Sequence, residues 1–102
     1  MPAAAICSVD QISTGHTCSA TALIQGALQT KVTVGGNSLA VQGDIIAPHT
    51  IKAGFSCVPH PGAVINAGSS KVSIGGKAVA RIGDSADAGY IISGSSNIFV
   101  GG

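Results

Sequence analysis

The chain has 102 residues, of which 9% are charged and 3% aromatic, and its formal net charge is +1 at neutral pH. This length predicts a single small domain, residues 1–102, with a thin aliphatic core. The scattered cations form no basic stripe, which argues against nucleic acid as a partner. No apolar run approaches the ~20 residues of a membrane-spanning helix, and the first residues lack the basic start of a signal peptide. The low charge suggests that a partner covers part of the surface.

Helix signals are nearly absent along the chain. All acidic residues are Asp, and no apolar stripe with helical spacing persists beyond two turns. The segment before residue 31 permits a short helical turn near residues 20–25. We therefore expect a mainly β protein.

An internal repeat is the strongest signal in the sequence. Residues 31–36 (KVTVGG) are echoed by residues 71–76 (KVSIGG) and 97–102 (NIFVGG). The alternation of β-branched residues predicts strands, and the Gly-Gly pair predicts a tight turn. The first two copies continue to Gly43-Asp44 and Gly83-Asp84, so each predicts a hairpin that ends at a Gly-Asp corner. The third copy ends the chain.

Residues 45–62 hold three of the four prolines and two of the three histidines, and we expect them to form a long functional loop. Cys57 and His60 have C-x-x-H spacing, which in a turn lets both side chains reach one ion. With His49 in the same loop and His16 before the first hairpin, they make a candidate metal site. Imidazole nitrogen and thiolate sulfur suit Zn²⁺ in a tetrahedron.

The three cysteines are an odd number and lack a secretory signal, which argues against a disulfide framework. Metal binding is the better interpretation for at least one of them. Cys18 competes with Cys57 for the sulfur position, and Cys7 is a weaker third candidate that we expect to be a small buried side chain.

Catalysis is not expected. A zinc hydrolase keeps one coordination position open for water and needs a carboxylate as general base. Three His and one Cys would close the tetrahedron, the chain contains no Glu, and its four Asp residues are explained as corners and turn formers.

The order of these motifs resembles that of PAAR-repeat proteins over essentially the whole chain. Residues 78–81 (AVAR) stand where the family has its Pro-Ala-Ala-Arg motif, and residues 1–4 (MPAA) resemble the family's opening. Ala88 occupies a position that is often Cys in relatives. The resemblance implies a small conical fold of β-hairpin repeats with a pseudo-threefold base. Its tip would be tied by one Zn²⁺ held by His16, His49, Cys57 and His60.

The same resemblance implies a structural protein that caps and sharpens a trimeric β-helical spike of a contractile injection machine. One chain would sit on each trimer, at the tip of a phage tail spike or a type VI secretion spike, after a cytoplasmic stage before assembly. It would pierce the target membrane transiently. We expect Lys31, Lys71 and Asn97 near the three sides of the base, and the His-Cys cluster at the point. The alternative is an adaptor that carries effector cargo on the tip.

Overall fold

The computed structural model describes residues 2–16, 18–60 and 62–101. Met1, Pro61 and Gly102, which belong to motifs named above, lie outside these described residues. Every regular element within the described ranges is a β-strand, which confirms the expectation of a mainly β fold. Those ranges contain no helix that is long and apolar enough to cross a membrane.

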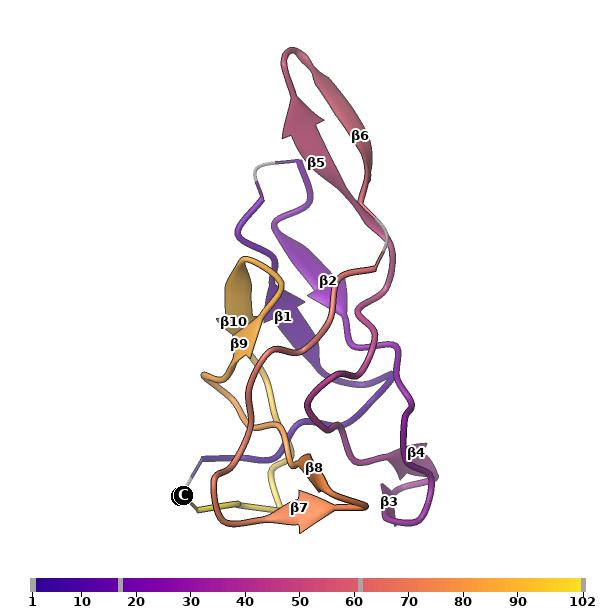
Figure 1. Ribbon diagram of the computed structural model, residues 1–102, viewed down its shortest axis with the longest axis vertical. Coiled ribbons are helices and arrows are strands. Elements are labelled where there is room, and N and C mark those ends of the chain that lie inside the picture. Colours follow the sequence, from indigo (N-terminus) through magenta and orange to yellow (C-terminus); the bar gives the residue numbers. More distant parts are fainter. Residues whose placement is uncertain (1, 17, 61, 102) are drawn as a thin grey trace.

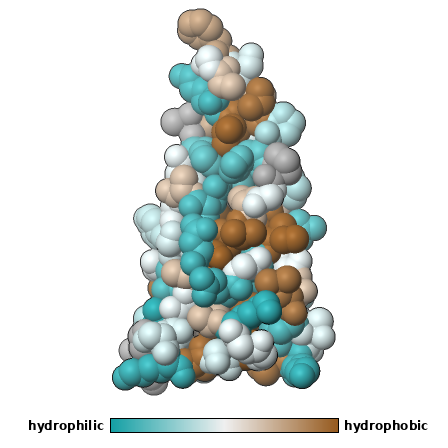
Figure 2. Space-filling model, viewed as in Figure 1, coloured by the Kyte–Doolittle hydropathy of each residue, from teal (hydrophilic) through white to brown (hydrophobic). Residues whose placement is uncertain are grey.

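The molecule is a cone with a broad base and a narrow point (Figures 1 and 2). Its principal extents are 42 × 23 × 23 Å, and the two equal short dimensions fit a body that repeats around its long axis. Two hairpins lie at the base. One joins β3 (Thr33–Val34) to β4 (Asn37–Ser38), and the other joins β7 (Ser73–Ile74) to β8 (Lys77–Ala78). Their Gly-Gly turns have positive φ at both residues, as a two-residue hairpin turn requires.

The third repeat is completed by the beginning of the chain. Ala3 forms a β-bridge with Phe99, and the amide of Ala4 donates to the carbonyl of Ile98 at 2.9 Å. Residues 3–10 therefore supply, through isolated β-bridges, the returning segment that the sequence does not place after the third copy. The equivalent hydrogen bonds in the other two copies run from Leu39 N to Val32 O and from Val79 N to Val72 O, both at 3.0 Å.

Three alanines close the copies into a ring. Ala5 donates its amide to the carbonyl of Ala80 at 3.0 Å, Ala80 donates to Ala40 at 2.9 Å, and Ala40 donates to Ala5 at 2.9 Å. All three residues are fully buried. Each occupies the same position in its copy, so this hydrogen-bond ring marks a pseudo-threefold axis through the molecule.

An aspartate closes each corner of the ring. Its Oδ2 atom accepts a hydrogen bond from the amide of a residue three or four positions earlier. Asp44 is fully buried and also accepts from the amide of Leu28 at 2.7 Å. These side chains stabilise the backbone, in agreement with the interpretation of the Gly-Asp motifs as corners. The three bonds are Ile6 N to Asp10 (2.7 Å), Val41 N to Asp44 (2.8 Å) and Arg81 N to Asp84 (2.8 Å).

A four-stranded antiparallel sheet rises above the base in the order β2-β1-β10-β9. Its strands are β1 (Gln11–Ser13), β2 (Thr21–Leu23), β9 (Ser85–Ala86) and β10 (Gly89–Ile91). Ile12 of β1 pairs with Ile91 of β10, and both are fully buried. Burial of one such side chain stabilises a fold by about 1.5–3 kcal/mol. The helical turn that the sequence permits near residues 20–25 does not form, because pairing with β1 draws this segment into β2.

The point of the cone is a separate hairpin, formed by β5 (His49–Ala53) and β6 (Ser56–His60) (Figure 1). The prolines of residues 45–62 predicted a loop here, and that prediction is wrong. Gly54, with φ of 65°, makes the turn, and Ile51 pairs with Val58 across the strands. Pro59 is tolerated because the strands of a lone hairpin have free outer edges, where no amide hydrogen is needed.

Candidate metal centre

Three histidines and one aspartate converge beneath the hairpin at the point. His16 precedes β2, His49 begins β5, His60 ends β6, and Asp87 lies in the turn between β9 and β10. Their candidate ligand atoms all lie within 4.8 Å of one another. Four segments that are distant in sequence thus meet at one small volume.

The Asp87 carboxylate lies at the centre of this group. Its Oδ2 is 2.7 Å from Nε2 of His49 and 3.0 Å from Nε2 of His16. Its Oδ1 is 3.1 Å from Nε2 of His60. The three imidazole rings pack with centroids 5.5, 4.9 and 5.1 Å apart. All three Nε2 atoms therefore face the same carboxylate.

Local backbone geometry places these side chains. Asp87 has a φ of 52° in its turn, and its amide donates to Val64 at 3.0 Å. Gly15 has a φ of 77°, and a Cβ atom there would lie 2.5 Å from the carbonyl oxygen of Ala88. Only glycine lets the His16 segment pass this close to the Asp87 turn. His49 Nδ1 contacts the carbonyl of Ala47 at 2.9 Å, which leaves Nε2 for the cluster.

The cluster is partly shielded from solvent. The side chains of His49 and Asp87 are 4% and 8% exposed, whereas those of His16 and His60 are 19% and 29% exposed. Burial by itself raises the pKa of Asp87. Hydrogen bonds with His60 and His49 and the charges of His16 and His60 outweigh this effect and hold the pKa below its ordinary value. Asp87 is therefore an anion at neutral pH, ready to serve as a ligand.

The His16 ring tests whether these residues fit a metal ion. Its Nε2 atom is buried and, within the described part of the chain, makes no hydrogen bond, although it lies 3.0 Å from Oδ2 of Asp87. A buried nitrogen without a partner is unfavourable. An ion bound by three imidazole nitrogens and one carboxylate oxygen would satisfy it. The group could therefore hold a four-coordinate metal ion.

The expected ligand Cys57 is not in this group, because it forms a disulfide with Cys18. The expectation of no disulfide is therefore wrong. Cys57 and His60 are three residues apart on β6, and side chains with odd spacing on a strand point to opposite faces. The C-x-x-H interpretation assumed a turn. Asp87 supplies the fourth candidate ligand atom in the group, and the signal for it in the sequence is its position beside Ala88.

Cys7 lies apart from the cluster and is 3% exposed, which confirms the expectation of a small buried side chain. Its Sγ is 3.5 Å from Oδ2 of Asp44. Burial, reinforced by the charge of Asp44, raises the pKa of this thiol to about 12. Cys7 is a packing residue rather than a nucleophile or ligand.

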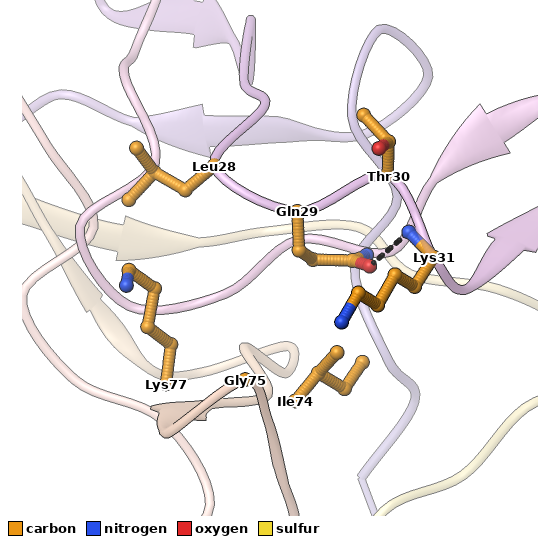
Figure 3. Close-up of a pocket in the computed structure, with 7 residues that line it drawn as sticks. All are labelled: Leu28, Gln29, Thr30, Lys31, Ile74, Gly75 and Lys77. Atoms are coloured by element: carbon orange, nitrogen blue, oxygen red, sulfur yellow. Dashed lines mark hydrogen bonds between the residues drawn. The ribbon is translucent and has the colours of Figure 1, made fainter.

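A pocket of about 270 Å³ lies between the first two copies of the repeat, at the base (Figure 3). In it the side-chain oxygen of Gln29 accepts a hydrogen bond from the amide of Lys31 at 2.9 Å. The titratable side chains among its lining residues are both lysines, so these residues supply no carboxylate. Its lining residues are Leu28, Gln29, Thr30, Lys31, Ile74, Gly75 and Lys77.

The fold is a cone of β-strands that is closed by a threefold ring and carries a His-Asp cluster, a candidate metal site, near its point. The family model of the PAAR motif matches residues 14–89 and again residues 56–102. The chain therefore belongs to the PAAR-motif family. Comparison with curated proteins gives no significant match. The family match supports a spike-tip-associated protein of contractile injection systems, in a family that is structural and associates with spike proteins.

Proposed function

We propose that this protein caps and sharpens the end of a trimeric β-helical spike, with one chain on each trimer and one Zn²⁺ near the point. The observation that supports this function is the hydrogen-bond ring of Ala5, Ala40 and Ala80. A trimeric spike ends in a threefold surface. A single chain matches that surface when it presents three similar faces.

The side chains at the base support the same function. Each copy begins with a polar side chain, here called the cap, that accepts hydrogen bonds from two backbone amides. The residue two positions after each cap is exposed; these residues are Lys31, Lys71 and Asn97. Val32, Val72 and Phe99 in these copies are 42%, 41% and 51% exposed. Contact with a spike would cover these apolar side chains, which explains how so few charges suffice. The three caps are Gln29, Ser69 and Ser95.

The proposed Zn²⁺ would be held by His16, His49, His60 and Asp87. Four protein ligands close a tetrahedral shell, so the ion contributes folding free energy and leaves no position for an activated water. We therefore propose a structural metal and no catalysis. The rigid point would meet the target membrane when a phage tail or a type VI secretion spike is fired, after assembly in the cytoplasm.

The experiment is a mass measurement of the complex with a candidate trimeric β-helical spike. We expect one chain per three spike subunits. Val72→Asp, which places a charge on the base, should weaken the complex at least tenfold, whereas Lys52→Asp on the hairpin at the point should not. Three chains per trimer, or no complex, would contradict the proposal.

A further inference from the structure

The hairpin at the point has little support of its own. It forms a separate two-stranded sheet, and its strands pair only with each other among the described strands. An isolated two-stranded hairpin is marginally stable in water at best. Yet β5 and β6 carry His49 and His60, so the metal site needs an external support that fixes this hairpin.

The segment that carries His16 provides this support. The hydroxyls of Ser19 and Thr50 lie 2.8 Å apart, and the amide of Thr50 donates to Ser19 Oγ at 3.1 Å. Cys18 is bonded to Cys57, so the same segment is linked covalently to β6. One short segment thus contacts both strands of the hairpin.

The register shows how the segment holds the hairpin. His49 is paired with His60, whereas Thr50 is paired with Pro59 and Lys52 with Cys57. Because side chains alternate along a strand, the two histidines lie on one face, and Thr50 and Cys57 lie on the other. His16 reaches the histidine face, and Cys18 reaches the opposite face two residues later. His16 and Cys18 therefore contact opposite faces of the hairpin.

We propose that the Cys18–Cys57 disulfide is the positioning element of the metal site, so that metal affinity depends on the redox state of these two cysteines. This inference rests on the proposed function, in which one Zn²⁺ is bound near the point of the cone. The disulfide joins residues 39 positions apart and fixes the His16 segment against the strands that carry His49 and His60. It acts as a supporting group that orients ligands without touching the ion. Loss of such a group typically lowers metal affinity 10- to 100-fold.

The disulfide forms by thiol–disulfide exchange with a low-molecular-weight disulfide. The Cys18 and Cys57 thiols lose two protons and two electrons, and the small disulfide takes them up as two thiols. Cys57 is exposed, so exchange needs no unfolding of the cone. A protein stored in a reducing compartment would hold its metal weakly, and one that meets an oxidising compartment would hold it tightly.

The test compares Zn²⁺ affinity, by competition with a chromophoric chelator, in three forms of the protein. These are the oxidised wild type, the wild type reduced with a phosphine, and the double variant Cys18→Ser with Cys57→Ser. We expect affinity in the double variant to fall 10- to 100-fold. Lys52→Ser, paired with Cys57 on β5 and exposed, should bind as the wild type does.

Amide hydrogen exchange separates this effect from unfolding. In the metal-free double variant, amides of β5 and β6 should lose protection while those of β1 and β10 keep it. Equal affinity with and without the disulfide overturns the inference. Tighter binding by the reduced wild type also overturns it, because Cys57 would then be a ligand. Absence of Zn²⁺ binding by the oxidised wild type would instead refute the proposed metal site itself. Loss of amide protection throughout the double variant would show that the disulfide stabilises the whole fold and not the metal site in particular, and would also overturn the inference.

Discussion

Asp87 belongs to a backbone turn and to the histidine cluster at the same time. Its positive φ of 52° is a conformation that Asp and Asn adopt more readily than most residues. The same residue brings a carboxylate within 3.1 Å of three imidazole nitrogens. The turn therefore selects a residue type that can also bind a metal.

Replacement of Asp87 by Asn tests the carboxylate without disturbing the turn. Asn tolerates the same backbone conformation but carries no negative charge. We expect Zn²⁺ affinity to fall at least tenfold, with the fold retained. The measurement is metal content after dialysis against a chelator, with Lys77→Ala at the base as the control. Full metal content in Asp87→Asn would remove Asp87 from the ligand set.

The cysteines can be counted by alkylation at pH 8. The folded protein should show no reactive thiol, because burial raises the pKa of Cys7 to about 12 and the other two cysteines are bonded. Unfolding without reductant should expose one thiol, and unfolding with reductant should expose three. Mass spectrometry of the alkylated protein gives the number directly. Three thiols without reductant would contradict the disulfide.

The histidines of the site were accessible to sequence reasoning, whereas Asp87 and the true partner of Cys57 were not. Three histidines in a chain so poor in titratable groups are conspicuous, and the structure brings all three together. Whether Cys57 faces His60 depends on strand or turn geometry, which spacing alone does not decide. Asp87 reaches the site only because β9 and β10 pair with distant strands.

At the scale of elements, the repeated hairpins were the predictable part of the fold. The Gly-Gly turns and β-branched alternation carry local signals for β3, β4, β7 and β8. β2 lacks such local signals and forms because it pairs with β1. The hairpin at the point also lacks them, and the prolines near β5 and β6 favoured the prediction of a loop. The Asp corners were also predicted, since a Gly-Asp pair is a local turn signal.

The corner at Asp44 gives a stability prediction. Its carboxylate accepts hydrogen bonds from Val41 N at 2.8 Å and Leu28 N at 2.7 Å, in a fully buried setting. Asp44→Ala leaves these donors unpaired and should lower the free energy of unfolding by about 2–4 kcal/mol. Asp44→Asn keeps one acceptor oxygen and should lose less. Guanidinium unfolding measures both, and an unchanged midpoint for Asp44→Ala would show that the corner is not structural.

The whole molecule depends on a crowded axis. Ala5, Ala40 and Ala80 are fully buried in their hydrogen-bond ring, so a larger side chain at any of them should strain the core. Ala40→Leu should destabilise the protein by about 1–3 kcal/mol. Leu at the two equivalent alanines should have a similar effect. Ala53→Leu, at the exposed end of β5, is the control for thermal unfolding. Clearly unequal losses at the three alanines would argue against equivalent copies.

The pairing of residues 3–10 with the third copy has a consequence for biosynthesis. Ala3 bridges to Phe99 and Ala4 bridges to Arg81, so the ring cannot close until the ribosome has released these late residues. Contacts between the two ends of a chain also slow folding, because a large loop must close first. Until residues up to Phe99 have left the ribosome, the nascent cone should therefore remain open, with its apolar seam accessible to chaperones. An arrested chain ending near residue 90 should be far more sensitive to protease than one that includes residues 91–102.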